Sequence, residues 1–401
     1  QAQQGQAVDA TGGKYRGALH GIPCGIKDLF ATKGIKTTWG ATPYKDQVIN
    51  LDATVVERLR DAGAVIIAKT TLTELANFVT NGMPGNYSAL GGYSMNPYDP
   101  RRDPRPNTND GRPVLNTGGS SSGAGTAANF WAANVGTETS GSILSPANQN
   151  MLAGIKPTVG RVSRHGVIPI TADQDTPGPM ARSVTDAAIM LGALESRAPD
   201  PNDPATSRCP PPPNRDYTAF LKTGALAGAR IGIPRAFFYV RADVLGGSGA
   251  GLNAYQAAAM TEAINVLTAR GAMVVDPANI PSVVTSRPAD NFLLWNVCSG
   301  LENAKGKDAD CSIVFKYGMK RDFNTWLTSL GATAPVRTLT ALRQWNIAHQ
   351  RAGAIKYGQA QLDISDEMDV AADRARYLAD RENDLRLSAS EGLDAAFKTH
   401  Q

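Results

Sequence analysis

The spacing of hydrophobic and polar positions predicts helices that alternate with short strands. In "DATVVERLRDAGAVIIAK", Asp52 has the character of an N-cap, and Val55, Val56 and Leu59 fall on one face of a helix. Gly63 then marks the C-cap before a buried strand. The same order returns in "AMTEAINVLTARGAMVVDP", where a helix ends at the glycine and a short apolar run follows. Two such helix–strand pairs predict an α/β fold, with a mainly parallel sheet and helices on its faces.

A third helix is predicted at "SVTDAAIMLGALE", where Ser183 and Asp186 form a capping signal. The residues expected along its inner side are Val184, Ala187, Leu191 and Leu194. Residues 196–216 are rich in Pro and Asp and predict an extended surface connection. The following residues, 217–401, are expected to be rich in helix, including a charged amphipathic helix within "DEMDVAADRARYLADRENDLRL".

Composition and charge narrow the class of protein. The 40 Lys and Arg nearly balance 36 Asp and Glu, and no basic stripe is interleaved with aromatics, so no nucleic-acid partner is predicted. No apolar run approaches the roughly 20 residues of a membrane span. The chain does not begin with Met, so a signal segment cannot be judged, and a bacterial cytoplasm or periplasm both stay open. The four cysteines form no C-x-x-C pair, although Cys298 and Cys311 are able to pair in an oxidising compartment.

Two clusters of Gly and Ser, "NTGGSSSGAG" and "GTETSGSILSPA", raise three hypotheses. Nucleotide binding fits the spacing Gly123-x-Gly125-x-x-Ala128. However, no apolar strand leads into this motif, no acidic residue follows at about twenty positions, and no Gly-Lys-Ser/Thr closes the run. These departures argue against a nucleotide site.

The second hypothesis is a nucleophile elbow, because Gly119-x-Ser121-x-Gly123 matches G-x-S-x-G. That chemistry needs an acid and a histidine after the serine, and the histidines that follow are His165, His349 and His400. Because no strand leads into the elbow, a histidine triad is disfavoured but stays open.

The third hypothesis starts from Lys27 in "HGIPCGIKDLF", near the end of an apolar run that would carry its stem into the interior. A buried lysine is costly unless it is paired or neutral. Together with "TGGSSSG", "GTETSGSILSPA", "GIKPTVGRVSRHGVIP" and "DQDTPGPMARSVTDAA", this block resembles the amidase signature family of hydrolases, and within it the bacterial peptide amidase-like members. Ordered blocks over residues 17–188 are more specific than any single motif.

The resemblance implies a Ser–cis-Ser–Lys triad made of Ser142 as nucleophile, Ser120 as bridging serine and Lys27 as base. Lysine accepts a proton only when it is neutral, so its pKa near 10.4 must fall by about 3, which burial can supply. The family's cis peptide maps onto Gly119–Ser120. Its oxyanion hole maps onto the backbone N–H groups of Thr139, Ser140, Gly141 and Ser142.

The chain also departs from the family pattern. Ser142 follows Ser120 by 22 positions, a slightly short interval, which leaves Ser121 and Ser122 as weaker candidates for the bridge. Leu144 stands where an arginine is frequent in the family. Family members usually extend further at the C-terminus. We therefore expect one amidase domain over residues 1–401 that is incomplete at both termini.

The resemblance implies one large mixed, mainly parallel sheet with helices on both faces. It further implies hydrolysis of a small-molecule or peptide amide through an acyl-enzyme by a monomer or homodimer, with no cofactor or metal. The alternative is a glutaminase subunit that supplies ammonia to a partner enzyme. The substrate is not determined by these motifs.

Overall fold

The computed structural model describes residues 15–108, 110–241, 250–298, 306 and 309–400. The chain divides into two compact units, each of which is treated by itself. The first comprises Gln1–Leu221 and Gly318–Asp366, and the second comprises Lys222–Tyr317 and Glu367–Gln401. Within the described ranges, no helix is both long and apolar enough to cross a membrane.

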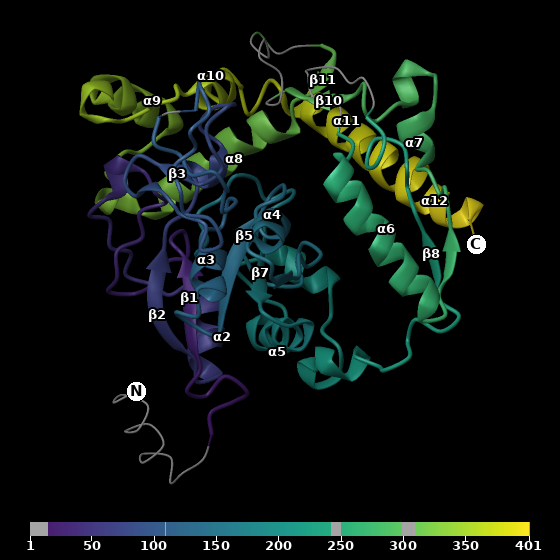
Figure 1. Cartoon of the computed structure of the whole chain (residues 1–401). Helices are drawn as coiled ribbons and strands as arrows, with labels where there is room; N and C mark the ends of the chain where they lie inside the picture. Colours follow the sequence, from purple (N-terminus) through teal and green to yellow (C-terminus); the bar gives the residue numbers. More distant parts are fainter. Residues whose placement is uncertain (1–14, 109, 242–249, 299–305, 307–308, 401) are drawn as a thin grey trace. The chain divides into compact units, whose positions relative to one another are not determined.

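The first unit is built on a five-stranded sheet with the order β2-β1-β5-β7-β6 (Figure 1). Its strands are β1 (Pro23–Lys27), β2 (Val65–Thr70), β5 (Ala133–Glu138), β6 (Ala153–Gly154) and β7 (Thr176–Ala181). β1 runs parallel to both β2 and β5, whereas β7 is antiparallel to β5 and to β6. The sheet is therefore mixed, as expected for this α/β fold.

The helix before β2 follows the predicted pattern except at its start. α2 (Thr54–Asp61) buries Val55, Val56 and Leu59, and Gly63 adopts a left-handed φ of 85° that ends the helix. Its N-cap residue is Ala53 and not Asp52. The Asp52 carboxylate instead accepts the Lys33 N–H at 2.7 Å and pairs with Arg60, so tertiary partners outcompete the local cap.

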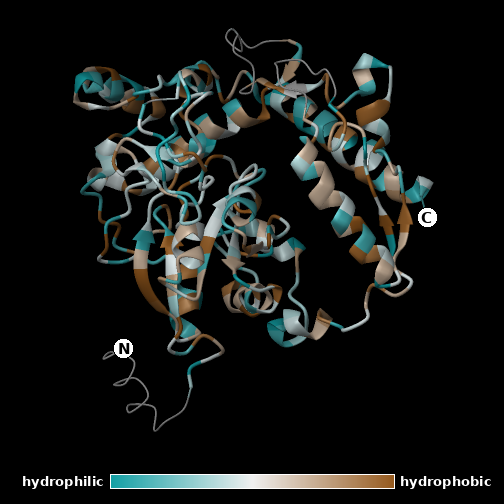
Figure 2. Ribbon diagram, in the orientation of Figure 1, coloured by the Kyte–Doolittle hydropathy of each residue, from teal (hydrophilic) through white to brown (hydrophobic). Residues whose placement is uncertain are grey.

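The helix α5 (Val184–Leu194) starts at the predicted cap, where the Ser183 side chain accepts the Asp186 N–H. Ala187, Leu191 and Leu194 are buried as predicted, but Val184 is 58% exposed because the first turn of α5 lies at the surface. Figure 2 shows hydrophobic residues along β2 and on α5.

The first unit also contains two short strands and several helices. They are β3 (Tyr87–Ser88), β4 (Gly92–Tyr93), α3 (Ser122–Ala127), α4 (Leu144–Gln149), α9 (Leu339–Ala348), α10 (Ala360–Asp366) and the part of α8 (Val314–Ser329) from Gly318 onward. The Pro-rich connection is irregular apart from short 3₁₀ helices at Pro204–Arg208 and Pro213–Arg215.

The second unit contains the other predicted helix–strand pair. α6 (Ala254–Ala269) leads into β9 (Met273–Val275), which pairs in parallel with β8 (Arg230–Gly232) in a sheet of two strands. This pair therefore does not extend the five-stranded sheet, because β9 finds its partner within its own unit. This unit also contains α7 (Pro281–Val284), β10 (Asn296–Val297), β11 (Cys311–Ser312), α11 (Arg374–Leu385) and α12 (Asp394–Thr399).

The second unit also contains a disulfide between Cys298 and Cys311, with their Cα atoms 5.0 Å apart. This is the pair that the cysteine positions suggested. Cys24 and Cys209 are free thiols.

Candidate active site

Lys27 ends β1 and lies fully buried, although it is charged at neutral pH in most proteins. Its Nζ atom donates to the carbonyl oxygen of Thr137 at 3.2 Å and to Thr137 Oγ1 at 3.0 Å. Burial lowers the pKa of Lys27 to about 7, while the negative charges of Asp175 and Glu138 act in the opposite direction. Burial therefore favours the neutral form of Lys27 near neutral pH.

Ser120 is also buried, and its Oγ donates to the same Thr137 carbonyl oxygen at 3.3 Å. Lys27 and Ser120 therefore converge on one acceptor of β5, the strand next to β1. The close fit depends on Gly136, since a Cβ atom there would lie 2.7 Å from Ser120 Oγ.

Ser142 lies on the turn that joins β5 to α4, and its hydroxyl rests against the backbone just before Ser120. A Cβ atom added to Gly119 would lie 2.5 Å from Ser142 Oγ. The fold thus gathers Lys27, Ser120 and Ser142 around the end of β5. Within the described part of the chain, no hydrogen bond joins Ser120 to Lys27 or to Ser142, because its hydroxyl is directed at Thr137.

The Gly119–Ser120 peptide bond differs from expectation. In the described residues the cis peptide bond is Asp276–Pro277, so the cis form expected before Ser120 does not hold in this structure. The trans form is the ordinary state of a bond that does not precede proline.

The turn before Ser142 leaves backbone donors free. The N–H groups of Ser140, Gly141 and Ser142 bond to no backbone or side-chain acceptor among the described residues. Gly141 adopts a left-handed φ of 80° with open space at its Cβ position, so glycine serves the turn's conformation here. The arrangement suits donors that are aimed at a bound anion.

Glu138 holds the other end of this turn. Its buried carboxylate accepts the N–H groups of Ile143 at 2.7 Å and Leu144 at 2.9 Å. These N–H groups lie at the start of α4, where the helix itself offers them no acceptor. Leu144 occupies the position of the family's frequent arginine and is 49% exposed. The nucleophile candidate therefore sits on a turn that a carboxylate fixes.

Asp175, which the sequence motifs did not single out, is a second buried acid beside the site. One carboxylate oxygen accepts from Thr139 Oγ1, and the other accepts the N–H groups of Ile170 and Thr171. Burial raises the pKa of Asp175 to about 7. Its place in the block "DQDTPGPMAR" was the available signal, but only the fold brings it to Thr139, 36 residues away.

The competing candidates are engaged elsewhere. Ser121 Oγ lies 3.2 Å from Thr117 Oγ1, and Ser122 Oγ accepts from the Asn134 amide at 2.8 Å. The His349 ring stacks on Trp345 with 3.8 Å between centroids. His165 lines a separate cavity, whose lining does not include Ser121.

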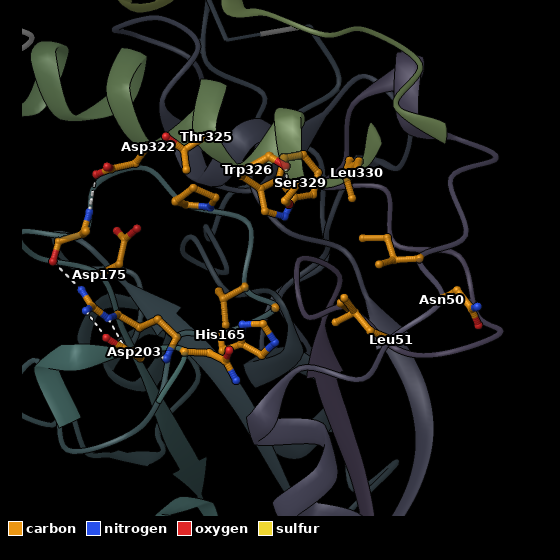
Figure 3. Close-up of a pocket in the computed structure, with 18 of the residues that line it drawn as sticks. Asn50, Leu51, His165, Asp175, Asp203, Asp322, Thr325, Trp326, Ser329 and Leu330 are labelled. Atoms are coloured by element: carbon orange, nitrogen blue, oxygen red, sulfur yellow. Dashed lines mark hydrogen bonds and ion pairs between the residues drawn. The ribbon is translucent and has the colours of Figure 1, made fainter. Parts of the chain in front are cut away.

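The cavity beside His165 has a volume of about 620 Å³ and borders Asp175 but none of Lys27, Ser120 and Ser142 (Figure 3). Trp326, Leu330 and Leu51 supply apolar walls, and Asp322 and Asp175 lie on the opposite side. One link between this cavity and the site is Asp175, whose carboxylate accepts from the Thr139 hydroxyl.

Comparisons with known proteins show the family of this chain. Residues 1–376 match the family model named Amidase, and the chain therefore belongs to the amidase family. It is similar to the solved native peptide amidase from Stenotrophomonas maltophilia, with 35% identity and a TM-score of 0.80. That match covers 100% of this chain and 71% of that one.

Two curated relatives extend the comparison. A probable amidase of Arabidopsis thaliana is 35% identical over 334 residues, which cover 82% of this chain and 55% of that protein. A glutamyl-tRNA(Gln) amidotransferase chain of Cereibacter sphaeroides is 40% identical over 238 residues, 58% of this chain and 44% of the other. The chain spans about half the length of the curated relatives that it matches.

Proposed function

We propose that this protein hydrolyses a carboxylic amide through a serine acyl-enzyme. The observation that carries the proposal is the buried Lys27, whose Nζ shares the Thr137 carbonyl with the Ser120 hydroxyl. A lysine with a pKa near the operating pH is suited to general base catalysis. Membership of the amidase family supports the same reaction.

In the proposed mechanism Ser142 Oγ attacks the amide carbon and loses its proton to Ser120, which passes its own proton to neutral Lys27. The Ser120 hydroxyl first turns away from the Thr137 carbonyl, because that bond holds it in the free enzyme. Catalytic hydrogen bonds often tighten only when substrate is bound.

The oxygen that becomes negatively charged is proposed to accept from the backbone N–H groups of Thr139, Ser140, Gly141 and Ser142, of which the last three are free in this structure. Donors fixed in the backbone need no reorganisation as charge develops, and one such donor is worth about 10²–10³ in rate. Collapse of the intermediate breaks the C–N bond as Ser120 returns the proton to nitrogen. Ammonia or an amine leaves, and water then hydrolyses the Ser142 ester.

The test is a panel of peptide amides, aryl amides and esters, assayed with the wild type and with single variants. We expect Ser142→Ala to abolish turnover and to prevent the acyl-serine adduct that mass spectrometry detects in the wild type. Lys27→Ala should lose nearly all turnover. Ser121→Ala is the matched control and should keep its activity, because its hydroxyl faces Thr117. Full activity in Ser142→Ala would refute the proposal.

The similarity to a glutamyl-tRNA(Gln) amidotransferase chain favours a second candidate, a glutaminase that supplies ammonia to a partner enzyme. Ammonia release from free glutamine, together with other proteins that co-purify with the chain, would support this candidate. Turnover of peptide or aryl amides by the isolated chain, without glutaminase activity, would favour the first.

A further inference from the structure

We propose that a second cavity of the first unit binds a small molecule that carries a phosphate or a comparable doubly charged oxyanion group. This cavity, the arginine cavity, has a volume of about 670 Å³. None of its lining residues belongs to the candidate active site. Its walls come from the segment before β1, from α2, from α5 and from the chain around residues 214–218. The charged residues among them are Arg16, Arg58, Arg197, Arg215, Asp61 and Asp216.

The charge of the arginine cavity is positive. Four guanidinium groups and two carboxylates line it, and the Glu57 carboxylate outside the lining lies 3.8 Å from Arg58, which leaves one positive charge (4 − 3 = 1). Asp61 pairs with Arg58 at 3.1 Å, and the Asp216 carboxylate accepts from the N–H and the hydroxyl of Thr218. The C-terminal end of α2 contributes about half a negative charge, which is smaller than this excess. An anion is therefore attracted.

Several guanidinium donors are unused. The Nε atom of Arg58 is buried without an acceptor in the described structure, and a buried donor without a partner is unfavourable. Arg16 and Arg197 are exposed, and their guanidinium groups pair with no other described residue. A ligand with several acceptor oxygens would satisfy these donors together.

The backbone around Arg215 is held in an unusual conformation beside the same cavity. Asn214 and Arg215 both adopt left-handed φ values, 57° and 56°. A Cβ atom on Gly192 of α5 would lie 2.1 Å from the Arg215 carbonyl oxygen, and one Arg215 nitrogen donates to the Glu195 carbonyl at 2.8 Å. These contacts fix the chain while the other guanidinium nitrogens stay available. Such conformations concentrate at ligand clamps.

The ligand class follows from the donors and the size. The planar guanidinium group matches phosphate and carboxylate oxygens in pairs of parallel hydrogen bonds. The volume of the arginine cavity lies within the range of small-molecule sites. This site is independent of amide hydrolysis, so the two proposals fail separately.

The experiment measures pyrophosphate binding to the whole chain by isothermal titration calorimetry, with citrate as a second probe. We expect one saturable pyrophosphate site per chain whose affinity falls as salt rises from about 50 to about 300 mM, since salt screens exposed charges. Arg16→Glu and Arg197→Glu should each weaken binding at least tenfold. Because both side chains are exposed, these variants should fold with unchanged thermal unfolding. Citrate distinguishes a carboxylate site from a phosphate site.

The matched control is Arg208→Glu, which reverses an exposed arginine of the same unit outside the arginine cavity. Its pyrophosphate affinity should equal that of the wild type. The proposal is overturned if neither pyrophosphate nor citrate binds saturably, or if Arg208→Glu weakens binding as much as Arg197→Glu. Unchanged binding in both Arg16→Glu and Arg197→Glu would overturn it as well.

Discussion

Replacement of Lys27 by methionine tests the buried base directly, because methionine is an unbranched apolar side chain one atom shorter than lysine and lacks the ammonium group. The folded protein lowers the pKa of Lys27 from an ordinary value of 10.5 to about 7. At 1.36 kcal/mol for each pKa unit, this difference corresponds to about 5 kcal/mol of stability lost in acid relative to strongly alkaline pH. The loss arises because a charged lysine is poorly solvated in the interior.

The pH dependence has a definite sign. Between pH 7 and 10.5 the unfolded chain holds the Lys27 proton and the folded chain has released it, so unfolding takes up a proton. Stability therefore rises with pH in this window. From pH 7 to pH 9, Lys27 should add about 2 kcal/mol to the wild-type free energy of unfolding, and Lys27→Met should lack this increment.

The assay is urea unfolding of both proteins at pH 7, 8 and 9, combined with the rate of amide hydrolysis from pH 5 to 9. The wild-type rate should rise about tenfold per pH unit below pH 7 and level off above pH 8. Lys316→Met removes a different fully buried lysine, which pairs with Glu367 in the second unit, and should keep its turnover. A difference in unfolding free energy between wild type and Lys27→Met that is constant across pH 7 to 9 would refute the reasoning, as would a flat pH–rate profile.

Three further substitutions test individual contacts. Gly119→Ala should lower kcat at least tenfold, because the new methyl group would lie 2.5 Å from Ser142 Oγ. Steady-state kinetics would measure this loss, and thermal unfolding should be the same as in the wild type. Glu138→Gln should cost about 2 kcal/mol in urea unfolding, because it replaces a charged acceptor of two N–H groups; an unchanged midpoint would contradict it. Cys298→Ser should lower the free energy of unfolding by about 3 kcal/mol, because it opens a loop that the disulfide closes over a separation of 13 residues. Thiol titration of the denatured wild type should find two thiols before reduction and four after.

The contact between Asp175 and Thr139 connects the candidate site to the cavity beside His165 in Figure 3. Thr139 begins the turn that carries the proposed oxyanion donors, and Asp175 also holds two backbone N–H groups of the neighbouring loop. The Asp175 carboxyl group therefore joins the start of the turn to the neighbouring loop.

Local signals in the sequence predicted several elements well. The cap at Ser183, the end of α2 at Gly63 and the buried face of α2 depend on residues within one or two turns of each other, so the sequence pattern determines them. The errors at Asp52 and Val184 have different causes. Tertiary partners engage Asp52, whereas Val184 lies in an exposed first turn of α5.

The sequence by itself determined the α/β class, the family resemblance and the burial of Lys27, since an apolar run carries that lysine inward. The tertiary structure alone decided which groups meet. Thr137 lies 110 residues from Lys27 and becomes its acceptor because β1 and β5 are neighbours in the sheet. Asp175 reaches Thr139 for a similar reason, because β7 runs antiparallel to β5 and brings their ends together. Strand order is set by packing of the whole sheet, which no local pattern of residues encodes.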